Sequence, residues 1–588
     1  MCNKIIILIF LLIPSMLWAA CPVPVGTVYT AVDVSVAEVQ SCINAADAAA
    51  GGTVQIPAGT STWTTALAST NFSHDIIIQG AGTGGTGTSP SGTYTAITGL
   101  MADAMFNNVR ADGTISLTIK DMRLIMSTGV TATISIRGTS LKKIIKNIYF
   151  DMSGKSTGRA VIFGSGGDAT QGGGVVTGCY FYNPTGTGQD ITPWGNVEGS
   201  YAYWNGNPQF GTANATYIEG CTFDHGEGGF ADGVMDAKAG VRMVFRYNEV
   251  KGSGVGWHGY DSSSAAHSVE VYRNNFTNGS YYPVFHARSG TALIWGNRAD
   301  SSYGAKHDLM YYRACAATDV NSPPVCGSTG QCAGDGGVDQ CVGSGNHAGY
   351  RCYQQPGSTG DNGITQWPMI EWDNIQGGGA TANMTFGWDS CKASVCAPET
   401  FSCDDLFQAK RDYINHDTCV GDGGAFCLNW WDDVNKKGKL NGSTYTAYTC
   451  PHPLTGLTGS CSSTAGTAGY DVEGDVTAPV VTAFTLPATN SGLSATVTIS
   501  SFTCTDATGV TGYCVNTSAT PPTSGTCSGS GWAASAQSTI TFASTNGLKI
   551  GYAWCKDAAG NISDALTAQS TLTLGVRQSG VTIRGGTF

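Results

Sequence analysis

Charged residues are scarce in this sequence, and long apolar runs are confined to its first twenty residues. Asp, Glu, Lys and Arg make up 12% of the 588 residues, against about 25% in an average globular chain. The net charge is −12 and no basic run occurs, so a nucleic-acid partner is not expected. No later segment approaches the roughly 18 apolar residues of a membrane-spanning helix. We therefore expect no membrane span.

Glycine is abundant instead, with 81 residues in the chain, roughly twice its average usage. Together with many Ser, Thr and Asn residues, this composition is typical of a secreted β-protein. The first twenty residues, MCNKIIILIFLLIPSMLWAA, have a basic start, an apolar centre and a small-residue exit. This is the pattern of a secretory signal peptide. We expect residues 1–20 to direct export, and the protein to be extracellular or at the cell surface.

Cysteines are frequent and fall into even groups. Apart from Cys2 in the expected signal, twenty cysteines form groups of two, two, twelve and four, at 21–42, 179–221, 315–461 and 504–555. Even numbers in an exported chain favour disulfides, and we expect Cys21 to pair with Cys42. No CxxC or Cys/His zinc spacing occurs, so these cysteines are not expected to bind a metal.

A short phrase returns between residues 119 and 297: an apolar strand, then Asn, Cys or Asp, often followed by an aromatic residue. Its copies are aligned on Asp121, Asn147, Cys179, Cys221, Asn248, Asn274 and Asn297, with spacings of 26, 32, 42, 27, 26 and 23 residues. One strand phrase per period predicts a solenoid of stacked coils. We expect the repeated Asn side chains to hydrogen-bond to one another as part of the scaffold.

Cys179 and Cys221 occupy the same place in successive phrases. Stacked strands lie about 4.8 Å apart, within the range that a disulfide tolerates, so this alignment predicts a disulfide between coils. The 42-residue gap is then one coil with an insertion at about 183–214. The aromatic residues of this insertion are Trp194, Tyr201, Tyr203, Trp204 and Phe210.

The remaining segments complete a two-domain prediction. Apolar residues at helical spacing in SVAEVQSCINAADAAA predict a short helix that caps the first coil. The solenoid is predicted over 21–465, with a disulfide-rich loop region at 303–465. Residues 466–476 have the composition of a linker, and short alternating strands at 477–570 predict a β-sandwich. The tail at 571–588 has no predicted role.

Several of these segments are similar to known families. GGTVQIPAGTSTW, IIIQGAGTGGT and the repeated N-x-F phrases carry a resemblance of the first 460 residues to the pectate-lyase-like superfamily. This resemblance implies an all-β, right-handed parallel β-helix. DVTAPVVTAFTLPAT and GYAWCKDAAGNIS resemble bacterial immunoglobulin-like modules. The GHG and RIK segments of polygalacturonases do not occur.

Strand alternation predicts a row of ionisable residues on one external sheet. In VMDAKA, VGWHGYD and PVFHARS, the apolar residues share one face and the polar residues the other. The predicted row spans three coils and comprises Asp236, Lys238, His258, Tyr260, His286 and Arg288. Trp194, Tyr203 and Trp204 of the insertion are predicted to wall this row and to stack on sugar rings.

Two chemistries suit such a groove. A lyase needs a cation to stabilise an enolate and a base to remove the α proton. Arg288 or Lys238 would supply the cation, and His258 or Lys238 the base. Asp236-Ala-Lys238 and Arg288-Ser-Gly resemble the Lys- and Arg-bearing strands of alginate lyase relatives, with a whole coil between them here. Hydrolysis needs two carboxylates, for which the candidates are Glu227, Asp232 and Asp236.

The sequence therefore predicts a secreted carbohydrate-active β-helix protein that binds and cleaves an extracellular polysaccharide, as a lyase or a glycosidase. The alternative is a non-catalytic surface adhesin or matrix protein, in which the charged row is a solvated surface. No cofactor is expected. Calcium is the one cation left open, at Asp335, Asp339 and Asp422, whose spacing fits no EF-hand.

Overall fold

The computed structural model divides the chain into two compact units, Met1–Tyr470 and Asp471–Phe588. It describes residues 21–575 except 69–70, 87–88, 103, 128, 155–157, 165–172, 185–187, 196–206, 227–232, 258–265, 280–283, 288–289, 304–306, 310–366, 377–409, 411–412, 415–418, 420–423, 436, 458–460, 462–478, 507–509, 523–525, 528–530 and 558–561. The predicted signal peptide and tail lie outside these residues. The boundaries predicted at 303, 465, 477 and 571 stay predictions.

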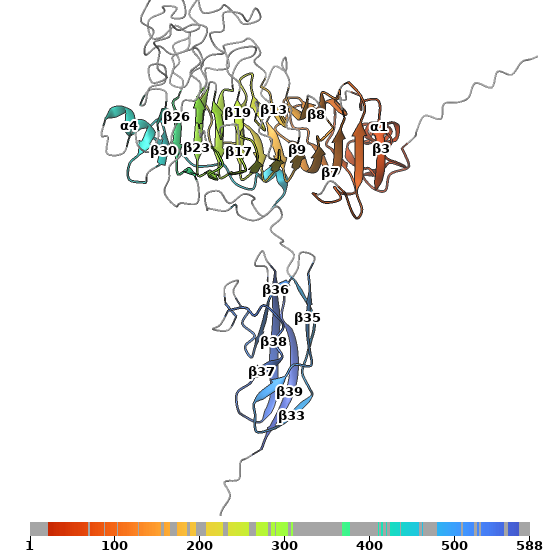
Figure 1. Ribbon diagram of the computed structural model, residues 1–588. Coiled ribbons are helices and arrows are strands. Elements are labelled where there is room, and N and C mark those ends of the chain that lie inside the picture. The colour runs from red at the N-terminus through yellow and green to blue at the C-terminus, as the bar shows by residue number, and fades with distance from the viewer. Residues whose placement is uncertain are drawn as a thin grey trace, which may run out of the picture. The chain divides into compact units, whose positions relative to one another are not determined.

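Unit 1 is built from parallel strands that stack coil on coil in three columns (Figure 1). Column one contains β1 (Val28–Thr30), β2 (Gly52–Gln55), β4 (Ile76–Gln79), the first parts of β7 (Leu117–Met126) and β9 (Lys143–Asp151), β11 (Gly174–Thr177), β14 (Thr216–Glu219), β17 (Arg242–Arg246), β20 (Ser268–Tyr272), β23 (Thr291–Trp295), β26 (Met369–Trp372) and β28 (Tyr413–Ile414).

Columns two and three complete each coil. Column two contains β3 (Gly59–Trp63), β5 (Thr95–Gly99), the second parts of β7 and β9, β12 (Tyr180–Tyr182), β15 (Thr222–Asp224), β18 (Glu249–Lys251), β21 (Asn275–Thr277), β24 (Arg298–Ala299) and β27 (Ile375–Gln376). Column three contains β6 (Phe106–Arg110), β8 (Ala132–Arg137), β10 (Arg159–Phe163), β13 (Ile191–Pro193), β16 (Asp236–Ala237), β19 (Val255–Trp257), β22 (Phe285–Ala287) and β25 (His307–Leu309).

The core lies between the three columns and is made of matching apolar residues from successive coils. Phe150, Phe181 and Phe223 occupy one register position, and their rings stack with centroids 4.7 and 4.6 Å apart. Burying one such side chain contributes about 1.5–3 kcal/mol. A single coil cannot bury these residues by itself, because they are covered by the neighbouring coils. The predicted parallel β-helix is confirmed.

A short helix closes the first coil, as predicted. Helix α1 (Val36–Ala48) begins after Ser35, whose hydroxyl accepts a hydrogen bond from the backbone N–H of Glu38. Its buried face, with Val39 and Ile43, packs on the apolar core of the solenoid. The Cys21–Cys42 disulfide ties the beginning of the described chain to this helix. Both the cap and this disulfide are confirmed.

The corner between columns one and two contains one left-handed residue in every coil from β7 to β26. These residues have φ between 51° and 63° and are Asp121, Asn147, Gly178, Gly220, Tyr247, Arg273, Gly296 and Asp373. Because Lys146 pairs with Thr177 and Tyr149 with Tyr180, Asn147 stacks with Gly178. The predicted alignment of Asn147 with Cys179 is therefore wrong by one residue, since Asn also suits a left-handed corner.

The amide ladder itself is confirmed in the later coils. The Nδ2 atoms of Asn248, Asn274 and Asn297 donate to the Oδ1 atoms of the Asn in the next coil, at 3.1, 2.9 and 2.9 Å. The last acceptor is Asn374, and each Nδ2 also donates to a backbone carbonyl of the preceding coil. These amides provide partners for buried backbone groups in the coils of Asn248, Asn274, Asn297 and Asn374.

Cys179 and Cys221 stack in successive coils, yet both are buried free cysteines. Each Sγ lies 3.4 Å from a carbonyl oxygen of its own coil, that of Thr177 or Glu219. The Cys221 thiol also makes a hydrogen bond with Cys179, so the two thiols are neighbours that are not joined by a covalent bond. The predicted disulfide is not formed. Burial raises the pKa of the Cys221 thiol, which disfavours the reactive thiolate.

The last part of unit 1 folds back along the outer face of column one. It contains α4 (Ala425–Trp430), β29 (Trp431–Asp432), β30 (Lys437–Leu440), β31 (Ser443–Thr444) and the 3-10 helix η3 (Pro453–Thr455). We call residues 445–457 the strap. Tyr448 and Leu454 of the strap pack on Tyr217 and Val244 of column one. Two disulfides, Cys419–Cys427 and Cys450–Cys461, lie in or beside this region.

A buried ion pair fastens the strap. Arg246 of column one lies 2.6 Å from a carboxylate oxygen of Glu219, and both side chains are inaccessible to solvent. The Arg246 guanidinium also donates to the backbone carbonyls of Tyr448 and Thr449, at 2.7 and 2.8 Å. Glu219 accepts the backbone N–H of His452 at 2.8 Å. Both charges of the pair thus take part in holding the strap.

Acidification is expected to loosen the strap through His452. Burial, aided by the neighbouring Arg246, lowers the pKa of His452 from 6.5 to about 4, and its Nδ1 accepts the backbone N–H of Leu454. The stability that the neutral ring contributes is complete above pH 6.5 and is lost as the pH falls toward 4. Hydrogen exchange of the strap amides, measured from pH 7 to pH 4, should show this loss.

The control is His452→Asn, whose side-chain oxygen keeps an acceptor for Leu454 but does not titrate. Burial raises the pKa of Glu270 to about 6, which stabilises the fold below that pH and opposes the effect of His452. The comparison of the two chains isolates the histidine. Equal pH dependence in the variant and the parent chain would contradict this role of His452.

Unit 2 is a small β-sandwich, as predicted. Its strands are β32 (Val480–Thr485), β33 (Thr489–Gly492), β34 (Thr496–Thr498), β35 (Ser501–Thr505), β36 (Val510–Asn516), β37 (Thr539–Thr541), β38 (Gly547–Asp557) and β39 (Leu566–Leu574). Most pairs are antiparallel, and β33 pairs with β39 in parallel. Phe484, Val497 and Phe502 lie in its core. The disulfides are Cys504–Cys555 and Cys514–Cys527.

Candidate functional site

Column three carries the residues of the predicted charged row that the structure describes. Asp236 stacks with Gly256 and His286 in successive coils. The adjacent Met235, Ala237 and Phe285 point into the apolar core, so the polar side chains lie on the outer face, as alternation predicts. His258, Tyr260, Arg288, Tyr203 and Trp204 lie outside the described residues, as do Glu227 and Asp232, so their predicted roles stay predictions.

Asp236, Lys238 and Trp194 form a compact group on this face. The Lys238 Nζ lies 3.6 Å from a carboxylate oxygen of Asp236 and 4.4 Å from the centre of the Trp194 ring. Trp194 and Lys238 are paired on adjacent coils, which holds the ammonium over the indole. A cation over an indole face gains about 0.5–2 kcal/mol. The residue that the sequence predicts for sugar stacking thus contacts the predicted catalytic lysine.

These polar residues are nearly buried. The exposed fractions of Asp236, Lys238 and His286 are 4%, 8% and 6%. A solvated surface pair would be far more exposed and would contribute little to stability. The interpretation of the row as an ordinary solvated surface therefore does not fit Asp236 and Lys238. The group has the burial and the mixed aromatic and charged character of a binding site.

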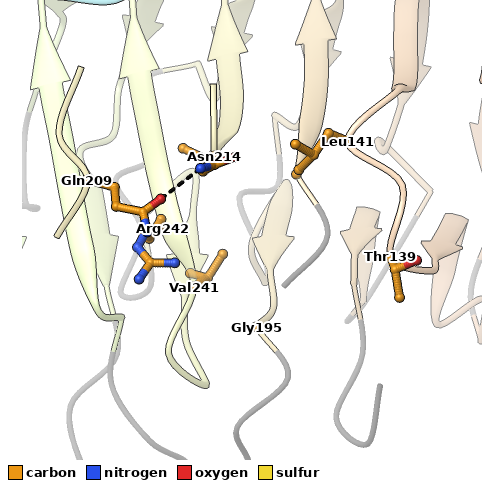
Figure 2. Close-up of a pocket in the computed structure, with 9 residues that line it drawn as sticks. Thr139, Leu141, Gly195, Gln209, Asn214, Val241 and Arg242 are labelled. Carbon is orange, nitrogen blue, oxygen red and sulfur yellow. Dashed lines mark hydrogen bonds between the residues drawn. The ribbon is translucent and has the colours of Figure 1, made fainter. Parts of the chain in front are cut away.

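A separate cavity lies where column three turns into column one (Figure 2). Its volume is about 290 Å³, near the lower end of the roughly 300–1,000 Å³ of small-molecule pockets. The lining residues are Thr139, Leu141, Gly173, Gly195, Gln209, Asn214, Ala215, Val241 and Arg242. Gly195, which lines the cavity, directly follows Trp194 in the sequence. The cavity and the Asp236–Lys238–Trp194 group therefore share this segment of the chain.

Small residues create this hollow. Thr216 pairs with Gly174 and with Met243, so Gly173, Ala215 and Arg242 occupy matching positions just before them. The two small residues leave space in the coils that precede Arg242. Arg242, Gln209 and Asn214 were not among the residues predicted from the sequence. The signal that would have pointed to them is the pattern Gly173, Ala215 and Arg242, each six residues before the aligned Cys179, Cys221 and Asn248.

Two further groups of ionisable residues in the described part of the chain have carboxylates with local hydrogen-bond partners. His225 Nε2 and Asp190 Oδ2 lie 2.5 Å apart with no solvent exposure, and Asn183 donates to the second oxygen of Asp190. On column two, Tyr180 donates to Asp224, which also accepts a hydrogen bond from the backbone N–H of Gly226. Because local partners occupy these carboxylates, we assign both clusters a structural role.

The described residues contain no group of three or more His, Cys, Asp or Glu side chains that could hold a metal ion. The calcium candidates Asp335, Asp339 and Asp422 lie outside the described residues. No helix within the described part of the chain is long and apolar enough to cross a membrane. The disulfides between described cysteines indicate an oxidising compartment.

Comparison with known proteins adds no family assignment, because no family model, curated protein or solved structure matches this chain.

Proposed function

We propose that this protein is a secreted β-helix protein of the pectate-lyase-like superfamily that binds and cleaves an extracellular polysaccharide on column three. The observation that carries the proposal is the nearly buried Asp236–Lys238 pair beside Trp194. Aromatic faces pack on sugar rings, and fixed charges orient a charged polymer. An extended polymer that lies along the solenoid axis contacts one strand of column three per coil. Successive strands of the column are about 4.8 Å apart.

The geometry favours a division of roles for a lyase. Lys238 forms an ion pair with Asp236, so it serves as the cation that stabilises the charge on a uronate. His258 then remains as the base that removes the proton α to the carboxylate. Asp236 positions Lys238, and His286 and Tyr260 bind neighbouring sugar residues. Arg288 supplies a second cation, whose fork suits a carboxylate.

Trp194→Ala and Lys238→Met are each expected to weaken polysaccharide binding about tenfold, because each removes a ring or a charge worth roughly 1–2 kcal/mol. Binding to a panel of uronate and neutral polysaccharides is measured by affinity electrophoresis. Cleavage is followed by the ultraviolet absorbance of unsaturated products and by new reducing ends. The parent chain is expected to bind and cleave at least one uronate polymer.

The matched control is Lys251→Met on column two. Lys251 also has a carboxylate neighbour, Glu249, at 3.5 Å, but the two side chains are 32% and 35% exposed. This variant should bind as the parent chain does. An equal loss in Lys251→Met and Lys238→Met, or no binding to any polymer of the panel, would count against the proposal.

The second candidate function is that of a surface adhesin or matrix protein. The burial that supports a binding site also favours this candidate, because the nearly buried Lys238, packed over the Trp194 ring of the preceding coil, can simply hold adjacent coils together. Glycan-array binding decides between the two. Binding without cleavage that survives replacement of Lys238, His258 and Arg288 by Ala would support the adhesin.

A further inference from the structure

The described lining of the cavity between columns three and one contains one ionised side chain. Among its nine described lining residues, Arg242 alone is ionised, and no lining residue is acidic. Burial lowers the pKa of the Arg242 guanidinium, although an arginine keeps its charge in proteins. A cation that has lost part of its hydration gains most from a bound anion, because the surroundings screen the attraction less.

The amides beside Arg242 are held in place. Asn214 donates to the side-chain oxygen of Gln209 at 2.8 Å, and the two lie on the Arg242 side of the cavity in Figure 2. Arg242 itself donates to the carbonyl of Asn207 at 3.4 Å. Gln209 has a left-handed backbone, and its N–H donates to the Asn207 side chain. These hydrogen bonds help to preorganise the polar wall.

Column one anchors the loop that carries these amides. The backbone N–H of Gly211 donates to Glu270 at 2.9 Å, and Ser268 donates to the carbonyl of Pro208 at 2.9 Å. On the other side of the cavity, Leu141 and Thr139 provide an apolar group and a hydroxyl (Figure 2). The cavity thus combines one cation, two amides, a hydroxyl and an apolar wall.

We propose that this cavity binds one carboxylate-bearing sugar residue, with its carboxylate on Arg242 and its hydroxyl groups on Gln209, Asn214 and Thr139. One guanidinium matches one carboxylate in charge and in fork geometry, whereas a phosphate would bring a second, unmatched charge. A volume of about 290 Å³ leaves room for one sugar ring. The choice of a sugar as carrier of the carboxylate rests on the proposed function.

Calorimetry on the full chain tests the site with free galacturonate and glucuronate, and with galactose, glucose, acetate and glucose 6-phosphate as comparisons. A uronate should bind at least tenfold more tightly than its neutral counterpart and than acetate. Arg242→Gln should weaken uronate binding roughly tenfold to hundredfold, as expected for a hydrogen bond to a charged group. Arg298→Gln, at an exposed arginine of column two, is the matched control and should change nothing.

Asn214→Asp is a second variant for the uronate-binding assay, in case Arg242→Gln destabilises the fold. Asn214 is exposed, so its replacement should leave thermal unfolding unchanged, while the added carboxylate repels the ligand and reduces binding at least tenfold. Tighter binding of glucose 6-phosphate, equal binding of neutral sugars, or no binding of either uronate would overturn the proposal. So would full uronate affinity in Arg242→Gln or Asn214→Asp.

A polymer-binding assay separates this inference from the proposed function. Lys238→Met should weaken polymer binding on column three about tenfold yet leave monosaccharide binding in the cavity unchanged. Uronate binding that depends on Arg242, without any polymer binding, would uphold the cavity and refute the proposed function. Polymer binding that depends on Lys238, without any uronate binding, would do the reverse. Each result therefore tests one site, so a failure of the cavity proposal can be distinguished from a failure of the proposed function.

Discussion

Replacing Asn274 by Leu is expected to lower the free energy of unfolding of unit 1 by about 3–5 kcal/mol, since each orphaned buried polar group costs roughly 1–3 kcal/mol. The Asn274 Oδ1 accepts two hydrogen bonds from Asn248, one from the backbone N–H and one from the side chain. Its Nδ2 donates to the carbonyls of Phe245 and Tyr272 and to Asn297. Leucine has a similar volume but replaces none of these five bonds.

Equilibrium unfolding in urea, followed by tryptophan fluorescence, measures this loss. The control is Asn275→Leu, one residue further on, because Asn275 is a half-buried residue of β21 outside the amide ladder. Its replacement should change the free energy of unfolding by no more than about 0.5 kcal/mol. Similar losses in the two variants would show that the amide ladder is not what holds these coils together.

Arg246→Met is the second substitution with a large expected effect, again about 3–5 kcal/mol. The change leaves Glu219 charged and buried, with the backbone N–H of His452 as its remaining described partner. It also removes the donors to the carbonyls of Tyr448 and Thr449. We therefore expect global destabilisation and faster proteolysis within the strap, residues 445–457.

A double substitution checks the physical reason. Replacing a buried ion pair by apolar residues of similar size is often neutral, whereas removing one partner is not. Arg246→Met combined with Glu219→Met should therefore recover much of the lost stability. Lys251→Met, at an exposed pair, should cost less than about 1 kcal/mol. If the double variant is no more stable than Arg246→Met, the unpaired Glu219 is not the source of the loss.

The solenoid could be predicted from the sequence because its determinants are local and repeated. Apolar residues alternate within each strand, and the ladder residues Asn248, Asn274 and Asn297 recur at nearly constant intervals. The register was harder to predict. Asn147 stands at the left-handed corner, a position that Asn, Asp and Gly all suit, so residue type alone did not distinguish it from the amide ladder.

The candidate site could be predicted in part for the same reason. Alternation placed Asp236, Lys238 and His286 on one outer face, but it carries no information on burial, which depends on segments distant in the sequence. The pairing of Trp194 with Lys238 depends on the register of column three, in which Trp194 directly follows β13. The cavity at Arg242 depends on small residues in two preceding coils, and these gain meaning only once the register is known.

The strap has a consequence for the order in which the chain acquires its structure. Arg246 obtains two of its partners from residues 202 and 203 positions later, and Lys146 contacts Thr455, 309 positions later. Early coils can stack as soon as they are synthesised. On column one, however, the Arg246 guanidinium and several aromatic rings stay uncovered until the strap has been synthesised. Contacts of such long sequence separation form slowly. A chain that ended before the strap would expose these aromatic residues of column one to solvent. The folding of unit 1 therefore depends on residues near its end.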